Sequence, residues 1–159
     1  MSSQVLSKQS SATQAFAALL RAHAAATLRL NAQLTADHGL TLSDFEVLLR
    51  LSRAPDRRMR RVDLAGQVLL TASGITRLLD GLESAGLVER GSCDTDRRVV
   101  YAVLTDAGLA KLAEASATHF PQVDQLFAPR LDAGEQEQLV ELLSRIGDGD
   151  APDCPPPAG

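Results

Sequence analysis

Arginines are concentrated in the middle of this chain, in a segment that contains no lysine. Residues 57–98 carry eight arginines and six acidic residues, a net charge of +2, whereas residues 99–159 carry three basic and ten acidic residues, a net charge of -7. The planar donor fork of a guanidinium suits phosphate groups and the edges of bases. A local basic region inside a chain of net charge -4 therefore favours contact with nucleic acid. The central arginines are Arg57, Arg58, Arg60, Arg61, Arg77, Arg90, Arg97 and Arg98.

Two of these arginines lie in a predicted β-hairpin. LVER (87–90) and VVYAVL (99–104) have the β-branched and aromatic composition of strands, and GSCDTDRR between them is rich in turn formers. Arginines on such an exposed loop can follow the DNA backbone and enter the narrow minor groove. The predicted DNA contacts of the hairpin are Arg90, Asp96, Arg97 and Arg98, with Asp96 orienting a neighbouring arginine such as Arg90.

The segment before the hairpin, TASGITRLLDGLESAGL, predicts a helix of about four turns that begins after Thr71 and ends at Gly86. At 100° per residue its leucines share one face, and short polar groups begin the opposite face. Small hydroxyls and one long arginine suit the major groove of DNA. A short helix predicted over 61–68 would complete a helix-turn-helix, although two packed helices with a solvated face remain the alternative on this segment alone. The predicted groove contacts are Thr71, Ser73, Thr76 and Arg77.

Both ends of the chain predict long amphipathic helices, one over about residues 11–37 and one from Thr105 onward. We expect the second to bend or break at Pro121 and again at Pro129. Neither has enough partners within one DNA-binding unit, so pairing across the twofold axis of a homodimer would bury them. The predicted organisation is an N-terminal dimerisation helix (1–38), a winged helix-turn-helix region (40–105), C-terminal dimerisation helices (106–147) and a disordered tail (148–159).

Over about residues 40–112 the chain resembles the MarR family of winged-helix transcription regulators. The matching stretches are LTLSDFEVLLRL, DLAGQVLLTASGITRLLDGLESAGLVER and DRRVVYAVLTDAGLAKL. The resemblance implies a mainly α fold with a small β-hairpin wing. It also implies a DNA-binding homodimer, acting as a repressor of a pseudo-palindromic operator, in which Arg98 enters the minor groove. Gly74 departs from the family, where a larger polar residue is frequent, and costs about 1 kcal/mol of helix propensity. The most specific matches are Asp96, Arg98, Leu104, Thr105 and Gly108.

Other classes of protein find little support in the sequence. No apolar run approaches the length of a membrane span, and the N-terminus lacks the apolar centre of a signal peptide, so we expect a cytoplasmic protein without membrane contact. No nucleophile elbow or glycine-rich phosphate loop is present, and we expect neither enzymatic activity nor a cofactor. Cys93 and Cys154 are too few for a disulfide framework.

The signal that controls such a regulator is harder to predict. The junction between the DNA-reading region and the terminal helices should be concave and mostly apolar. We expect a small anionic or phenolic effector there that lowers DNA affinity, bound by polar or aromatic residues chosen from His23, Phe45, Arg50 and His119. A zinc-responsive regulator is one alternative, with ligands from His38, Asp44, Glu46 and His119, although their spacing is not compact. A thiol sensor at Cys93 is another, because nearby arginines favour the thiolate.

Overall fold

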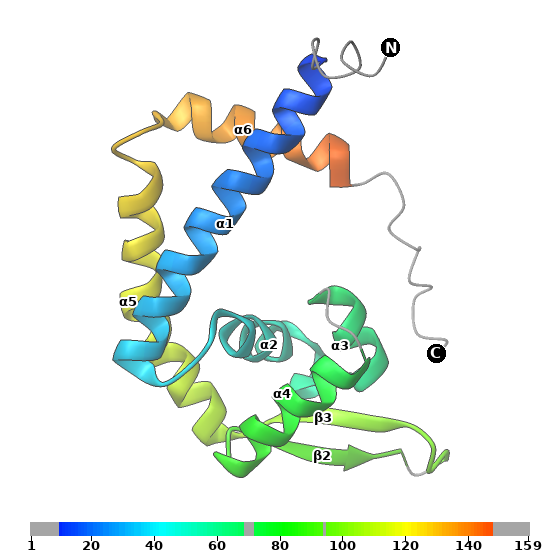
Figure 1. Cartoon of the computed structure of the whole chain (residues 1–159). Coiled ribbons are helices and arrows are strands. Elements are labelled where there is room, and N and C mark those ends of the chain that lie inside the picture. Colours follow the sequence, from blue (N-terminus) through cyan, green and yellow to red (C-terminus); the bar gives the residue numbers. More distant parts are fainter. Residues whose placement is uncertain (1–9, 69–71, 94, 148–159) are drawn as a thin grey trace. The chain divides into compact units, whose positions relative to one another are not determined.

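The computed structural model describes residues 10–68, 72–93 and 95–147 and consists of two compact units, residues 1–120 and 121–159. The helix α5 (Asp106–Phe127) runs from the first unit into the second, which also holds α6 (Ala133–Gly147) (Figure 1). The chain is mainly α-helical with one small sheet, as predicted. The other elements, all in the first unit, are α1 (Ser11–His38), α2 (Leu42–Arg53), η1 (Pro55–Arg57), β1 (Arg58–Arg60), α3 (Arg61–Gln67), α4 (Ala72–Ser84), β2 (Val88–Ser92) and β3 (Val100–Leu104).

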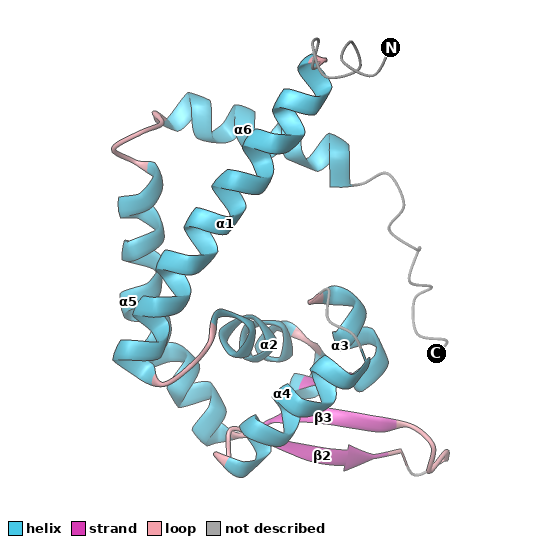
Figure 2. Ribbon diagram, in the orientation of Figure 1, coloured by secondary structure: helices cyan, strands magenta, loops and turns pink. Residues whose placement is uncertain are grey.

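The sheet is antiparallel, with the strand order β1-β3-β2. β2 and β3 form the predicted hairpin, which projects away from the helices and is called the wing (residues 88–104) below (Figure 2). The register pairs Val88 with Leu104 at the base of the wing and Ser92 with Val100 near its tip. β1 was not predicted, because three residues are too short to show alternation and their partner strand lies far along the chain.

Leucine side chains dominate the core of the first unit, which gathers residues from α1 to α4, from the sheet and from α5. α4 contributes Ile75, Leu79 and Leu82, all buried, at the three- and four-residue steps of one helix face. Val88, Ala102 and Leu104, at the base of the wing, are buried in the same core. The core therefore fixes which face of α4 points inward and which remains outside.

Local capping residues begin and end several of the helices. Gly39 ends α1 in the left-handed conformation, with φ of 68°. Thr41 caps α2, because its hydroxyl accepts from the Asp44 N–H while the Asp44 carboxylate accepts from the Thr41 N–H. Asp132 and Glu135 form the same reciprocal pair at the start of α6. The predicted cap Thr71 lies outside the described residues.

The helix after the wing is not broken at Pro121, the first of the two positions where we expected a bend or a break. α5 continues through Pro121 and ends at Phe127, two residues before Pro129. A proline inside a helix removes one N–H donor, and the hydrogen bonds of the turns on either side can hold the helix together. None of the helices in the described part of the chain is long and apolar enough to cross a membrane.

Candidate nucleic-acid interface

The outer face of α4 has the composition that the sequence predicts. Ser73, Thr76, Arg77 and Asp80 are exposed, opposite the buried leucines. Ser73 and Thr76 each have an interaction within the chain. Arg77 has no hydrogen-bond or ion-pair partner among the described residues. α4 thus presents two hydroxyls and one unpaired guanidinium on a single surface, supported from below by Ile75 and its neighbours.

The tip of the wing is organised by Asp96. Its carboxylate accepts a hydrogen bond from the Arg98 N–H at 2.9 Å, and its carbonyl oxygen accepts from the Val99 N–H at 3.1 Å. These bonds form a tight turn that leaves the side chains of Arg97 and Arg98 exposed. Within the described residues neither guanidinium has a partner. Cys93 lies nearby, half-buried, with its Sγ 3.1 Å from the Thr95 hydroxyl.

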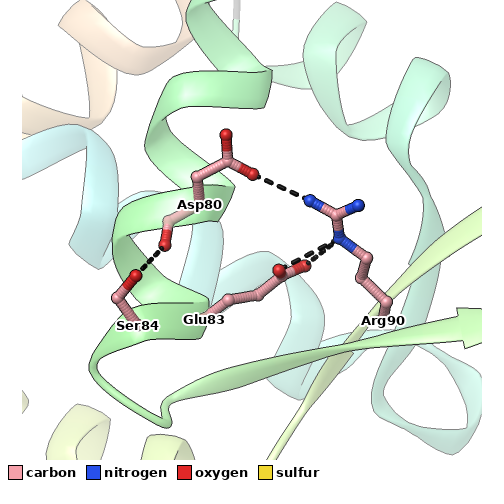
Figure 3. A network of polar contacts seen from close by, with 4 residues as sticks. All are labelled: Asp80, Glu83, Ser84 and Arg90. Carbon is pink, nitrogen blue, oxygen red and sulfur yellow. Dashed lines mark hydrogen bonds and ion pairs between the residues drawn. The ribbon is translucent and has the colours of Figure 1, made fainter.

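The expected pairing of Asp96 with Arg90 is wrong. Arg90, on β2, instead reaches back to α4, where Nη2 donates to Asp80 Oδ1 at 2.9 Å (Figure 3). Its Nε donates to both oxygens of Glu83, at 2.9 and 3.0 Å. The hydrogen bond with Glu83 and the charge of that carboxylate raise the pKa of Arg90. Arg90 points at the helix because it shares a face of the sheet with Val88, whereas Asp96 is used by the backbone of its own turn.

Seven of the eight central arginines fall into two groups; the eighth, Arg61, is half-buried, and its buried Nη2 has no hydrogen-bond partner among the described residues. Those of the first group are held within the chain: Arg57 by Asp106 at 2.9 Å, Arg60 by Asp63 at 2.7 Å, Arg90 by the two carboxylates of α4, and Arg58 over the ring of Tyr101 at 4.5 Å. The second group, Arg77, Arg97 and Arg98, is exposed and has no such partner in the described residues. An unpaired arginine can bind an anion without first breaking an internal ion pair.

A cavity of about 440 Å³ lies between α3, α4 and the wing. Thr76 and Arg98, which belong to different elements, both line it, so the structure brings two predicted contacts to one concave surface. Arg60 and Arg61 also line it, and the sequence reasoning did not include them among the site residues. The run RMRR (58–61), which ends at the first residue of α3, is the sequence feature that could have indicated these two arginines. The full lining is Arg60, Arg61, Val62, Ala65, Ile75, Thr76, Arg98, Val99 and Val100.

The four predicted effector residues do not form one site. Phe45 and His119 do meet, with ring centroids 4.5 Å apart and Phe120 beside both. His119 is buried and its Nδ1 has no hydrogen-bond partner among the described residues, and burial lowers its pKa. His23 is exposed on α1. Arg50 lines a separate cavity of about 400 Å³, where it pairs with Glu46 at 2.8 Å.

The four residues of the zinc alternative are also engaged separately. His38 Nε2 lies 2.6 Å from the Thr118 hydroxyl, and its Nδ1 lies 3.4 Å from Glu114. Asp44 serves in the cap of α2 and Glu46 pairs with Arg50. Across residues 10–68, 72–93 and 95–147, no three histidine, cysteine or acidic side chains lie close enough to hold a metal ion.

Comparisons with known proteins agree with this geometry. The sequence profile of the MarR family matches residues 40–100. The chain is 32% identical over 110 residues to the HTH-type transcriptional regulator MhqR of Bacillus subtilis, an alignment that covers 69% of this chain and 74% of that protein. It is 32% identical over 111 residues to the HTH-type transcriptional repressor YetL of the same organism, covering 70% and 66%. The solved structure of Sco3205, a MarR family transcriptional regulator from Streptomyces coelicolor in complex with DNA, matches with a TM-score of 0.83 at 28% identity, over 92% of each chain.

Proposed function

This chain belongs to the MarR family of transcriptional regulators and binds DNA, and from that membership we propose that it acts as a homodimeric repressor of a pseudo-palindromic operator. The relative YetL is itself named a repressor. In the proposed complex, each copy reads one half-site. α4 enters the major groove as the recognition helix, and the wing reaches the adjacent minor groove.

The observation that carries this proposal is the set of unpaired arginines. Arg77 on the outer face of α4 and Arg98 at the tip of the wing have no partner among the described residues. Two guanidiniums on separate projecting elements fit a duplex that presents two grooves. We assign Ser73, Thr76 and Arg77 to the major groove, Arg98 to the minor groove and Arg97 to phosphates. Asp96 supports the turn that carries both wing arginines, and Thr71 would extend the contacts at the start of α4.

Exposed apolar side chains support the homodimer. On α1, Phe16, Leu20 and Leu28 are 62%, 51% and 75% exposed. In the second unit, α6 exposes its own apolar residues, Val140, Leu142, Leu143 and Ile146. Apolar surface of this kind is typical of protein interfaces. We therefore assign residues 1–38 and 106–147 to dimerisation and residues 40–105 to DNA binding.

The proposed signal is a small anionic or phenolic compound that lowers DNA affinity. Phe120 is 46% exposed and lies beside the buried rings of Phe45 and His119, and this accessible ring supports a site for an aromatic group in the first unit. The compound would bind the conformation that does not fit DNA more tightly than the one that does. A difference of about 2–3 kcal/mol between these two binding free energies would weaken DNA binding about 30- to 150-fold.

Selection from a random pool of DNA duplexes tests the proposed function. Purified protein should enrich a motif of two inverted half-sites whose centres lie about one helical turn apart, or a multiple of it. Titration of anionic and phenolic compounds against the preformed complex should then release the DNA. Enrichment of a single asymmetric site, or of no motif, would contradict the homodimeric repressor. Release by a metal ion or an oxidant alone would contradict the proposed effector.

A further inference from the structure

Arg90 connects α4 and the wing, the two elements that bind neighbouring grooves of DNA in the proposed function. We infer that Arg90 is a positioning residue, which makes no contact with DNA and instead fixes the angle between α4 and the wing so that Arg77 and Arg98 reach one duplex together. This inference rests on the proposed function. Figure 3 shows the guanidinium spanning Asp80 and Glu83, which lie three residues apart and so on one side of α4.

An apolar contact lies beneath this bridge. Leu79 and Leu82 of α4 pack in the same buried cluster as Val88 and Ala102 of the sheet. Hydrophobic burial holds the two layers together, and its free energy depends less on direction than that of a hydrogen bond does. A planar guanidinium held by two carboxylates adds direction, because its hydrogen bonds require fixed donor and acceptor orientations. The bridge therefore adds directional restraint to the apolar contact.

Small errors at the bridge become large errors at the tip of the wing. Arg90 pairs with Ala102 on β3, four residues after Arg98. Arg98 lies in the turn before β3, at most about 13 Å from Ala102 along the wing, so a tilt of about 10° would move it by up to about 2 Å. A displacement of that size exceeds the range of about 0.5 Å over which a donor and an acceptor keep a good hydrogen bond. Accurate placement of Arg98 thus depends on the angle at Arg90.

The charges of the network also favour positioning over contact. One arginine with two carboxylates carries a net negative charge, and Asp80 lies on the exposed face that includes Thr76 and Arg77. Two carboxylates beside phosphates oppose DNA binding, so their presence there is understandable if they hold Arg90. The side chains of Arg90 and Asp80 are 55% and 52% exposed, so the network adds little to the stability of the fold.

The test compares the variants Arg90→Gln, Glu83→Gln and Asp80→Asn by fluorescence anisotropy on a selected operator and on a scrambled duplex. Glu83→Gln and Asp80→Asn each remove a negative charge, so simple electrostatics predicts tighter binding to any DNA. We expect tighter binding to the scrambled duplex only, and operator affinity lower on the order of tenfold. Arg90→Gln should weaken operator binding similarly and add nothing to a protein that already carries both other substitutions, because all three disrupt one unit.

The dependence of binding on salt separates positioning from contact. Arg90→Gln should leave the slope of log Kd against log salt unchanged, whereas the control Arg97→Ala should reduce it by about 1. Arg90→Lys keeps the charge but cannot bridge both carboxylates, and it should lose operator affinity with an unchanged slope and a melting temperature within about 4 °C of the wild type.

Three results would overturn the inference. A reduced slope for Arg90→Gln would make Arg90 a phosphate contact. Tighter operator binding by Glu83→Gln would show that the carboxylates only repel DNA. Wild-type affinity in Arg90→Lys would show that the bridge sets no angle. If the wild-type protein selects no DNA motif, that result contradicts the proposed function and not the inference about Arg90.

Discussion

The backbone of Gly108 lies so close to Leu87 that a Cβ atom at position 108 would be 2.0 Å from the Leu87 carbonyl oxygen. The same carbonyl accepts the Thr105 N–H at 3.2 Å, and the Thr105 hydroxyl donates to the Gly86 carbonyl oxygen at 2.7 Å. This junction joins the turn after α4 to the start of α5. It gives the LT-x-x-G pattern a physical meaning, since the threonine binds the turn and the glycine makes room for it.

Gly108→Ala should therefore destabilise the protein by about 1–3 kcal/mol, because backbone rather than a flexible side chain must move. Thermal unfolding should show the melting temperature falling by about 2–4 °C for each kcal/mol.

Gly81→Ala is the matched control. Gly81 also lies within a helix, but a Cβ there meets nothing within 4 Å. We expect this change to stabilise the protein by about 0.5–1 kcal/mol, since alanine loses less backbone entropy in a helix than glycine does. Equal effects of the two substitutions would contradict the close approach at Gly108.

His119 should make stability depend on pH. Burial lowers its pKa in the folded protein, so between that value and the unfolded value near 6.5 the unfolded chain binds more protons. The stability is fully present above about pH 6.5 and falls as the pH drops toward the folded-state pKa, by about 1.4 kcal/mol for each unit that separates the two values.

Denaturant titrations at pH 7.5 and 5.5 measure this loss. His119→Phe, which keeps an aromatic ring beside Phe45, should lose less stability over that interval than the wild type. An identical loss in both proteins would show that His119 binds protons alike in the folded and unfolded states, and would contradict the assignment.

Local patterns explain why so much of the fold could be predicted. Helix periodicity and caps depend on residues a few positions apart, such as Thr41 with Asp44, and the turn formers between β2 and β3 are contiguous. The outer face of α4 follows from the same periodicity. Strand β1 was not predicted because its stabilising partner, β3, is distant in sequence.

The site could be predicted in its residues but not in all its pairings. Asp96 is closer to Arg90 in sequence than Asp80 is, yet the fold turns Arg90 toward α4 and uses Asp96 in its own turn. Likewise, the sequence does not indicate that Phe45 and His119 meet while Arg50 faces another cavity. Partner choice among charged and aromatic residues depends on tertiary packing, which periodicity does not describe.

Charged substitutions on the exposed face of α1 should weaken the dimer. Leu20 is 51% exposed in one chain, so Leu20→Asp should leave each copy folded while burying an unpaired charge at the interface. Sedimentation velocity should show monomers at concentrations where the wild type is dimeric. Val62→Asp changes an equally apolar residue, 72% exposed on α3, and should leave the dimer intact. Dissociation by both variants, or by neither, would contradict dimerisation through α1.

Arg77 and Arg98 should differ in how they affect specificity. Arg77→Ala removes a proposed contact to base edges in the major groove, so its loss of affinity should concentrate on particular positions of the operator. Competition among single-base variants of the operator measures this. If Arg77→Ala weakens binding to all the variants and to a scrambled duplex equally, Arg77 contacts only the backbone.

The affinity of Arg98→Ala for the selected operator, at matched salt, tests the central claim most directly. Arg53→Ala is the matched control, because Arg53 is also an exposed arginine of the first unit but lies outside the proposed interface. We expect Arg98→Ala to bind more weakly by about 1–3 kcal/mol with an unchanged melting temperature, and Arg53→Ala to bind within about twofold of the wild type. Unchanged affinity of Arg98→Ala, or an equal loss in both variants, would contradict the assignment of the wing to the minor groove.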